Sequence, residues 1–330
     1  MPKIREVIKR DIGVKVEGVV KVFDDSALAT EIREYVVTDK IEHELKRVLD
    51  TFTQVSETLR RGSSGRDVMG IWVSGFFGSG KSHFAKMLGH LLCNTALDVD
   101  GSESSIDSFG KHLTDSSIGR DVRLRLGEVK LNTKVHGIFF EIKSRQSLTN
   151  PGSVGEILLS EFYRSIGLSE NIVIARIERQ LQRRGLYESF ISEYEARFQD
   201  SWQSMDGRDD TLFLRRRLPP VLAAIAPQEY PDVTAAALAV DDMMKLQKIT
   251  AEGIADELVA WTDSQKTVGG KVAHLVFVID EMGTFIGDST DRISELNSLA
   301  EMIGNKGKGK VWLVVIGQTN SNCIFDCVTR

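Results

Sequence analysis

Four short apolar segments constrain the fold of this 330-residue chain more than any other feature. Each is nearly continuous in apolar residues and rich in β-branched or aromatic side chains, which is typical of a parallel strand covered on both faces. The four segments are residues 70–74, 135–142, 275–279 and 311–316. Because helical patterns separate them, we predict an α/β fold with a parallel sheet and crossover connections.

A long connection separates the second and third segments. It contains about 130 residues, far more than an ordinary strand-to-helix connection requires. Most of it has a helical pattern, which we expect the pair Pro219-Pro220 and the stretch between Pro227 and Pro231 to divide. We therefore predict a helical insertion.

These patterns suggest three parts of the chain. Residues 170–263 form the helical insertion, and residues 67–169 with 264–330 form the α/β core. Residues 1–66 are predicted to be a mostly helical N-terminal region, because their apolar residues recur at helical spacing. Within the core, residues 98–117 are rich in Ser, Asp and Gly and predict a surface loop.

A glycine-rich loop follows the first segment and precedes a helical pattern. It matches the phosphate-binding (Walker A) pattern GxxxxGK[ST]. Its glycines let backbone amides approach a phosphate at the N-terminus of the following helix. Lys81 is expected to reach the β- and γ-phosphates, and Ser82 to ligate Mg²⁺. The expected nucleotide contacts are Gly75, Phe76, Phe77, Gly78, Ser79, Gly80, Lys81, Ser82 and the adjacent His83.

Two carboxylates follow the third segment, in the pattern of a Walker B element. Asp280 is expected to take part in the magnesium site, and Glu281 to act as the general base that polarises the attacking water. The alternative is an acidic pair that only ends a strand and caps the next helix. The adjacent phosphate-binding pattern favours the catalytic interpretation.

The fourth segment ends at a polar tip, where Gln318 is a candidate to sense the γ-phosphate and assist catalysis. An ordinary polar strand end is an equally good interpretation. Together the motifs predict a P-loop NTPase of the AAA+ or additional-strand type. GTPase signatures (DxxG and NKxD) are absent at matching places, so ATP with Mg²⁺ is favoured over GTP. Arg215-Arg216-Arg217 could supply an arginine finger, although such a run is more often a solvated helix face.

Composition narrows the class of protein. The formal net charge of −5 provides no global basic field for nucleic acid, so a DNA contact would need a local patch. Three cysteines are too few for a disulfide framework, and no signal peptide or membrane span is recognisable. We therefore expect a cytoplasmic protein that does not interact with membranes.

The sequence around the glycine-rich loop closely resembles a known family. The run from Glu34 to Thr38 (EYVVT), the phrase SGFFGSGKSHF, and the later LVFVIDEMG and VWLVVIGQ are similar to the BrxC/PglY ATPases of BREX (bacteriophage exclusion) and phage growth limitation systems. The resemblance implies an ATPase in antiviral defence. It also implies partners, including a DNA methyltransferase and a PglZ-type phosphatase-like protein, and it leaves a homo-oligomer possible.

The chain is much shorter than members of that family, so we expect an N-terminal portion of such a protein. Few residues remain after the fourth segment, too few for a further strand, its helix and a lid. The strand before the glycine-rich loop would then have an exposed edge, unless residues 13–23 cover it. We accordingly expect the chain to bind nucleotide but to hydrolyse it poorly.

Two alternatives to an ATPase module remain. One is a non-catalytic scaffold. In this alternative the helical insertion binds partners, and bound ATP only orders the protein without being hydrolysed. The other is a DNA-engaging ATPase similar to initiator-type AAA+ proteins, whose activity DNA would stimulate in a salt-dependent manner.

Overall fold

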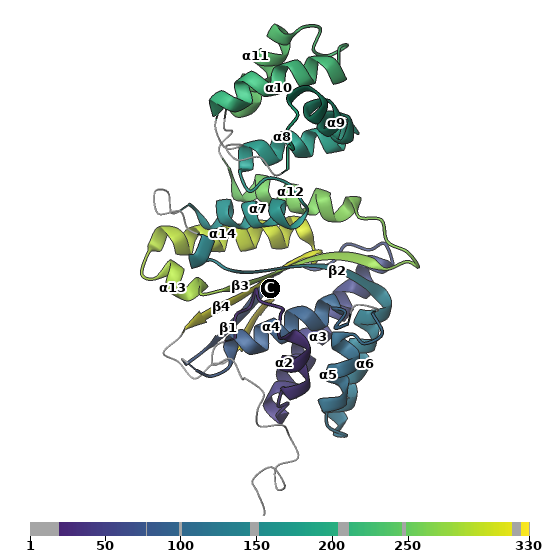
Figure 1. The fold of residues 1–330 in the computed structure, drawn as a ribbon. Helices are drawn as coiled ribbons and strands as arrows, with labels where there is room; N and C mark the ends of the chain where they lie inside the picture. The colour runs from purple at the N-terminus through teal and green to yellow at the C-terminus, as the bar shows by residue number, and fades with distance from the viewer. Residues whose placement is uncertain are drawn as a thin grey trace, which may run out of the picture.

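A mixed α/β architecture is observed in the computed structural model, which describes residues 20–76, 78–98, 101–145, 152–203, 211–245, 249–318 and 325–329. Five strands form one sheet in the order β2-β3-β4-β1-β5 (Figure 1). The strands are β1 (Val68–Gly75), β2 (Thr133–Glu141), β3 (Val272–Asp280), β4 (Val311–Gln318) and β5 (Phe325–Thr329).

The four predicted strands are confirmed, and they are parallel. β1 and β3 are not neighbours, because β4 lies between them. Glu141 pairs with Asp280 at the ends of β2 and β3, and Gly75 pairs with Gln318 at the ends of β1 and β4. The carboxyl ends of all four strands therefore meet at one edge of the sheet, which is where ligands bind in open α/β sheets.

Helices cover both faces of the sheet. The first face is covered by helices that precede β2, and the second by helices that follow it (Figure 1). On the first face are α2 (Leu28–Glu34), α3 (Asp39–Arg60), α4 (Lys81–Cys93), α5 (Ser105–Phe109) and α6 (Ser117–Asn132). On the second are α7 (Val154–Ser165), α12 (Ala251–Ser264), α13 (Met282–Ile286) and α14 (Thr290–Gly307).

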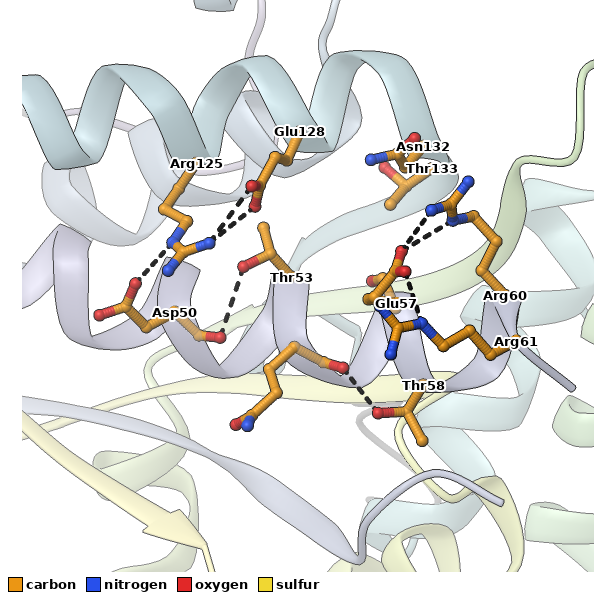
Figure 2. Close-up of a pocket in the computed structure, with 12 residues that line it drawn as sticks. Asp50, Thr53, Glu57, Thr58, Arg60, Arg61, Arg125, Glu128, Asn132 and Thr133 are labelled. Atoms are coloured by element: carbon orange, nitrogen blue, oxygen red, sulfur yellow. Dashed lines mark hydrogen bonds and ion pairs between the residues drawn. The ribbon is translucent and has the colours of Figure 1, made fainter. Parts of the chain in front are cut away.

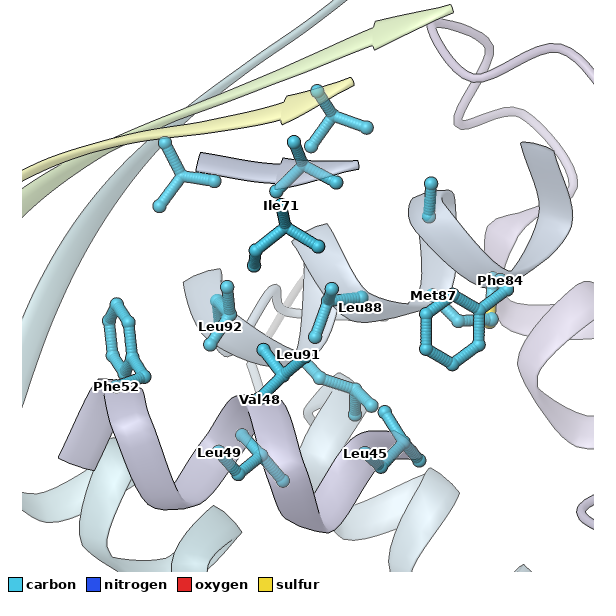
Figure 3. Close-up of a cluster of buried hydrophobic side chains, with 14 of the residues drawn as sticks. Leu45, Val48, Leu49, Phe52, Ile71, Phe84, Met87, Leu88, Leu91 and Leu92 are labelled. Atoms are coloured by element: carbon cyan, nitrogen blue, oxygen red, sulfur yellow. The ribbon is translucent and has the colours of Figure 1, made fainter. Parts of the chain in front are cut away.

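The alternation of side chains along β3 explains this layering. Val276 and Val278 belong to the core on the first face, whereas Leu275, Phe277 and Ile279 belong to the core on the second. A strand with apolar residues at every position buries both faces, as the sequence pattern predicts. Figure 3 shows the first core, in which apolar side chains of α3 and α4 meet below the sheet.

A helical unit lies beyond α7 and α12 and has a core of its own (Figure 1). Its helices are α8 (Ile172–Arg183), α9 (Tyr187–Phe198), α10 (Thr211–Ile225) and α11 (Val233–Met244). α12 lies in the sequence range that we assigned to the insertion, yet it packs on the sheet through Ile254 and Leu258.

The expectation that Pro219-Pro220 divides the insertion is wrong, because both prolines lie inside α10. Leu218 and Val221 on either side of them are buried in the core of the helical unit, and this packing outweighs the lost helix hydrogen bonds. The second proline stretch does separate helices, since Pro227 and Pro231 lie between α10 and α11.

Residues 98–117 do not form the predicted surface loop throughout. They contain α5, a 3₁₀ turn η1 (Gly110–His112) and the start of α6. Ser104 and Ser116 each cap a helix by accepting a backbone N–H, and Ile106 and Phe109 are buried. The polar residues that suggested a loop are therefore partly helix caps, which is their usual role next to an apolar residue.

The edge of β1 that we expected to be exposed is paired. β5 runs antiparallel to β1, from Val68↔Thr329 to Val73↔Phe325. The expectation of an exposed edge is therefore wrong, because the five residues of β5 pair with this edge. Of the segment suggested as an alternative cover, residues 13–19 lie outside the described part of the chain.

Candidate functional site

The loop between β1 and α4 combines two left-handed glycines with the start of a helix. Gly78 has φ = 76° and Gly80 has φ = 81°, a region that residues with a Cβ rarely adopt. Gly80 directly precedes α4, whose first N–H groups have no partner within the helix. The Lys81 Nζ donates a hydrogen bond to the carbonyl oxygen of Phe76 at 2.7 Å, so the lysine side chain folds back along the loop.

Asp280 lies opposite this loop, at the carboxyl end of β3. The Glu281 backbone N–H donates a hydrogen bond to Oδ1 at 2.8 Å. Burial raises the pKa of Asp280, and interactions with the Ser82 hydroxyl and the Glu281 N–H partly offset this rise. A partly buried carboxylate favours a neighbouring cation, and the Lys81 charge is close enough to act on Asp280.

Glu281 has an unusual backbone conformation. Its φ of 60° lies in the left-handed region, and it occupies the position just before the single turn of α13. Its Oε2 accepts a hydrogen bond from the Thr284 hydroxyl at 2.6 Å, which fixes the direction of the carboxylate. A non-glycine residue in this region is strained, and such residues cluster at functional sites.

A cavity of about 520 Å³ joins these groups. Lys81, Ser82, Asp280 and Glu281, predicted on distant parts of the sequence, all line it. Glu141 also lines it, because the end of β2 lies beside the end of β3. Glu141 belongs to none of the predicted motifs, although its position as a charged residue at the end of an apolar strand was a usable signal. Thr284 was missed as well, because its role depends on contact with Glu281.

A second cavity, of about 460 Å³, lies on the other side of the loop. Tyr35, Ile41 and Phe84 provide apolar surface, and Gly80 and Lys81 line it as well as the first cavity. His83 also borders both, and its ring contacts Tyr35 edge-on with centroids 4.6 Å apart. Burial lowers the pKa of His83, so the ring is neutral at pH 7.

The remaining predicted contacts are placed as follows. Phe76 is 55% exposed beside the loop, and Ser79 lines the second cavity. Phe77 lies outside the described residues. Gln318 ends β4 next to Gly75, but its side chain also lies outside the described part of the structure, so the sensor role stays a prediction.

The arginine run does not reach the cavity. Arg215 pairs with Asp241, and Arg217 pairs with Asp200 and contacts Tyr194, all within the helical unit. Both contacts agree with the interpretation of a helix face. No cluster of three or more His, Cys, Asp or Glu side chains in the described residues has the arrangement of a protein-only metal site.

A larger groove of about 790 Å³ lies between α3 and α6 and offers a contrast (Figure 2). Its charged side chains pair with each other: Arg125 with Asp50 and Glu128, and Arg60 and Arg61 with Glu57. A groove whose charges are mutually satisfied offers little to a charged ligand, so the loop-side cavity is the better candidate site.

No protein-family model matches this chain, and no solved structure matches it either. Among the described helices, none is both long and apolar enough to cross a membrane. The chemistry of the site therefore has to be inferred from its own geometry.

Proposed function

We propose that this chain is a P-loop NTPase that binds ATP with Mg²⁺ and hydrolyses its terminal phosphoanhydride bond. The observation that carries the proposal is that Lys81 and Ser82 of the glycine-rich loop line one cavity together with the acidic end of β3, Asp280 and Glu281. The position of β4 between β1 and β3 also supports the additional-strand type of the fold.

Different groups of the cavity would have different roles in phosphoryl transfer. Amides of the loop and the N-terminus of α4 provide hydrogen-bond donors and positive potential for the phosphates. Lys81 would leave the Phe76 carbonyl and neutralise charge on the β- and γ-phosphates. Glu281, held by Thr284, would accept a proton from the attacking water.

The residues also fit a magnesium ion. Ser82 and Asp280 would hold it, and their oxygen atoms are the ligands that Mg²⁺ prefers, with phosphate and water oxygens completing the set. When bound, the ion neutralises charge that develops on the phosphates. Burial raises the pKa of Asp280, and a magnesium ion beside its carboxylate would favour the charged form.

The second cavity is where we place the base. It adjoins the loop through Gly80 and Lys81 and offers apolar surface from Tyr35, Ile41 and Phe84. Planar bases pack favourably on such surface. The preference for ATP over GTP rests on the absence of GTPase signatures in the sequence.

Two variants test the proposal. Lys81→Ala should abolish nucleotide binding, and Glu281→Gln should retain binding but block hydrolysis, as expected for an interaction needed only in the chemical step. Titration with fluorescent ATP and single-turnover hydrolysis would measure the two effects. A Lys81→Ala variant that binds ATP as tightly as the parent would show that the site is assigned wrongly. Tight binding without turnover, in this chain and also in a full-length form, would favour the non-catalytic scaffold.

The resemblance to BrxC/PglY proteins supports a wider proposal, that this ATPase serves a phage-defence assembly. The helical unit, with its own core, is a candidate to contact other components. In cells that carry a complete defence system, the Lys81→Ala variant should lose protection in a phage-plating assay. DNA stimulation of the ATPase would instead favour the DNA-engaging alternative.

A further inference from the structure

The short segment of residues 20–23 forms part of the wall of the proposed phosphate cavity. Lys21 lines this cavity together with Lys81, Ser82, Glu141, Asp280 and Glu281. In the sequence, Lys21 precedes the glycine-rich loop by about sixty residues and belongs to no motif, so only the tertiary structure brings it to the site.

Lys21 is fixed at the cavity through the residues that follow it. Val22 is fully buried in the first core, and the Asp24 N–H donates to the Lys21 carbonyl at 3.3 Å, which closes a turn. The carbonyl of the same residue, Asp24, accepts a hydrogen bond from Lys86 Nζ at 2.5 Å. Lys86 belongs to α4, so the turn is attached to the same helix that begins with Lys81.

Lys86 is completely buried, so this attachment lies inside the protein. Its ammonium group pairs with Glu31 of α2 at 2.7 Å, so the charge is neutralised inside the protein. A second contact joins Asp25 to His90, also in α4, at 3.1 Å. The turn that carries Lys21 is therefore tied to α4 at two positions.

The ammonium group of Lys21 itself is free to meet a ligand. It is exposed, and no carboxylate of the described residues lies within ion-pair distance of it. Its charge acts only weakly on Asp24. The other lysine of the cavity, Lys81, already interacts with the Phe76 carbonyl.

We propose that Lys21 contacts the terminal phosphate of bound ATP and stabilises the charge that develops there during hydrolysis. It would do in the same chain what an arginine finger does in phosphoryl-transfer enzymes. This inference rests on the proposed function. In the reaction, water oxygen forms a bond to the γ-phosphorus, the bond from γ-phosphorus to the bridging oxygen breaks, and ADP leaves. Lys21 gains and loses no proton.

Other cations of the described chain are less suited. Arg215 and Arg217 are engaged in the helical unit. Arg292, near the catalytic pair in sequence, donates to the Phe285 carbonyl at 2.5 Å and stacks on its ring. None of these three arginines lines the phosphate cavity.

The test uses the full chain with Lys21→Ala, the conservative Lys21→Arg, and Lys266→Ala as a matched control. Lys266 is also exposed but lies just before β3, at the opposite end of the strands. Affinities for MgATP, its non-hydrolysable imido analogue and MgADP would be measured by titration, and hydrolysis in single turnovers. Circular dichroism would verify that each variant is folded.

Lys21→Ala should slow single-turnover hydrolysis roughly 10- to 100-fold. It should also lower the affinity for the imido analogue more than the affinity for MgADP. Lys21→Arg should restore most of the hydrolysis rate and most of the affinity for the imido analogue. Lys266→Ala should have the same rate and affinities as the parent. If the parent binds nucleotide but Lys21→Ala leaves the hydrolysis rate and the ratio of analogue to ADP affinity unchanged, the inference is wrong while the proposed function stands. A parent that binds no nucleotide overturns the proposed function itself, and this inference with it.

Discussion

At the scale of single residues, Glu281 combines backbone strain with a proposed catalytic role. Its φ of 60° places a long side chain in a region favoured by Gly, Asn and Asp. Nothing in local sequence requires this conformation. It arises because the chain leaves β3 and must begin α13 within one residue, which also directs the carboxylate to Thr284 and the cavity. The backbone conformation that strains Glu281 is therefore the same one that directs its carboxylate, the proposed base, towards the cavity.

A comparison of two variants tests this strain. Glu281→Asn should be more stable than Glu281→Gln by roughly 0.5–1 kcal/mol, because Asn adopts the left-handed region more readily than Gln. Both variants should lack hydrolysis, so the comparison separates backbone strain from chemistry. Urea denaturation would give the two free energies of unfolding. Equal stability of the two variants would show that residue 281 carries no strain that Asn can relieve.

At the scale of secondary-structure elements, the approach of α4 to the sheet determines where Lys81 and Ser82 lie. Gly89 makes the close approach possible: a Cβ at this position would lie 2.5 Å from Phe139 Cε1 and 2.7 Å from Val278 Cγ2. Both neighbours are held in strands β2 and β3. The helix that begins at the glycine-rich loop is therefore seated by a glycine that no phosphate-binding pattern includes.

Two glycine-to-alanine changes in helices should act in opposite directions. Gly89→Ala should lower the free energy of unfolding by roughly 1–3 kcal/mol, because the methyl group overpacks the contact with the sheet. Gly127→Ala in α6 should raise it by roughly 0.5–1 kcal/mol, because nothing lies within 4 Å of the new methyl group and alanine favours a helix.

Chemical denaturation of both variants would measure these effects. Gly127→Ala serves as the matched control, since it makes the same chemical change in another helix. A Gly89→Ala variant as stable as the parent would mean that α4 can move away from the sheet at little cost. In that case its nucleotide affinity should be measured too, because such a movement would displace Lys81.

At the scale of the whole molecule, one buried histidine joins three segments. His274 in β3 hydrogen-bonds to the Ser56 hydroxyl of α3 at 2.9 Å and to the Gly309 carbonyl, just before β4, at 3.0 Å. Burial lowers the pKa of His274 to about 4, from an ordinary value near 6.5. The folded protein therefore holds this ring neutral over a range in which the unfolded chain binds a proton.

This difference predicts the direction of a pH effect. The contribution of His274 is fully present above about pH 6.5 and is lost as the pH falls towards 4, because only the unfolded state takes up the proton in that interval. The loss should reach up to about 3 kcal/mol. His274→Gln should flatten the dependence of the unfolding free energy on pH between 6.5 and 4, as measured by denaturation at several pH values.

The exposed His43 provides the control for this experiment. His43→Gln should leave the pH dependence close to that of the parent, because this exposed ring is not enclosed between packed segments as His274 is. If the unfolding free energy of His274→Gln falls with pH as steeply as that of the parent, then His274 does not cause the loss of stability between pH 6.5 and 4. Buried carboxylates would cause it instead.

The sequence by itself determined the four parallel strands, the glycine-rich loop and the acidic pair. Local periodicity and composition suffice for these, because an apolar run covered on both faces and a loop with positive φ angles each impose their own residue types. The helix caps within residues 98–117 and the continuous α10 were missed, because packing of Phe109, Leu218 and Val221 overrides local preference.

Only the tertiary structure decided which residues share the cavity. The parallel registers bring Glu141 beside Asp280, the start of α13 aims Glu281 at Thr284, and the buried Lys86 ties the turn of Lys21 to the helix of Lys81. These contacts join residues between three and 139 positions apart. Contacts of this kind depend on how elements pack in space. A charge at the end of an apolar strand hinted at Glu141, but no local pattern around Lys21 could reveal its place at the cavity.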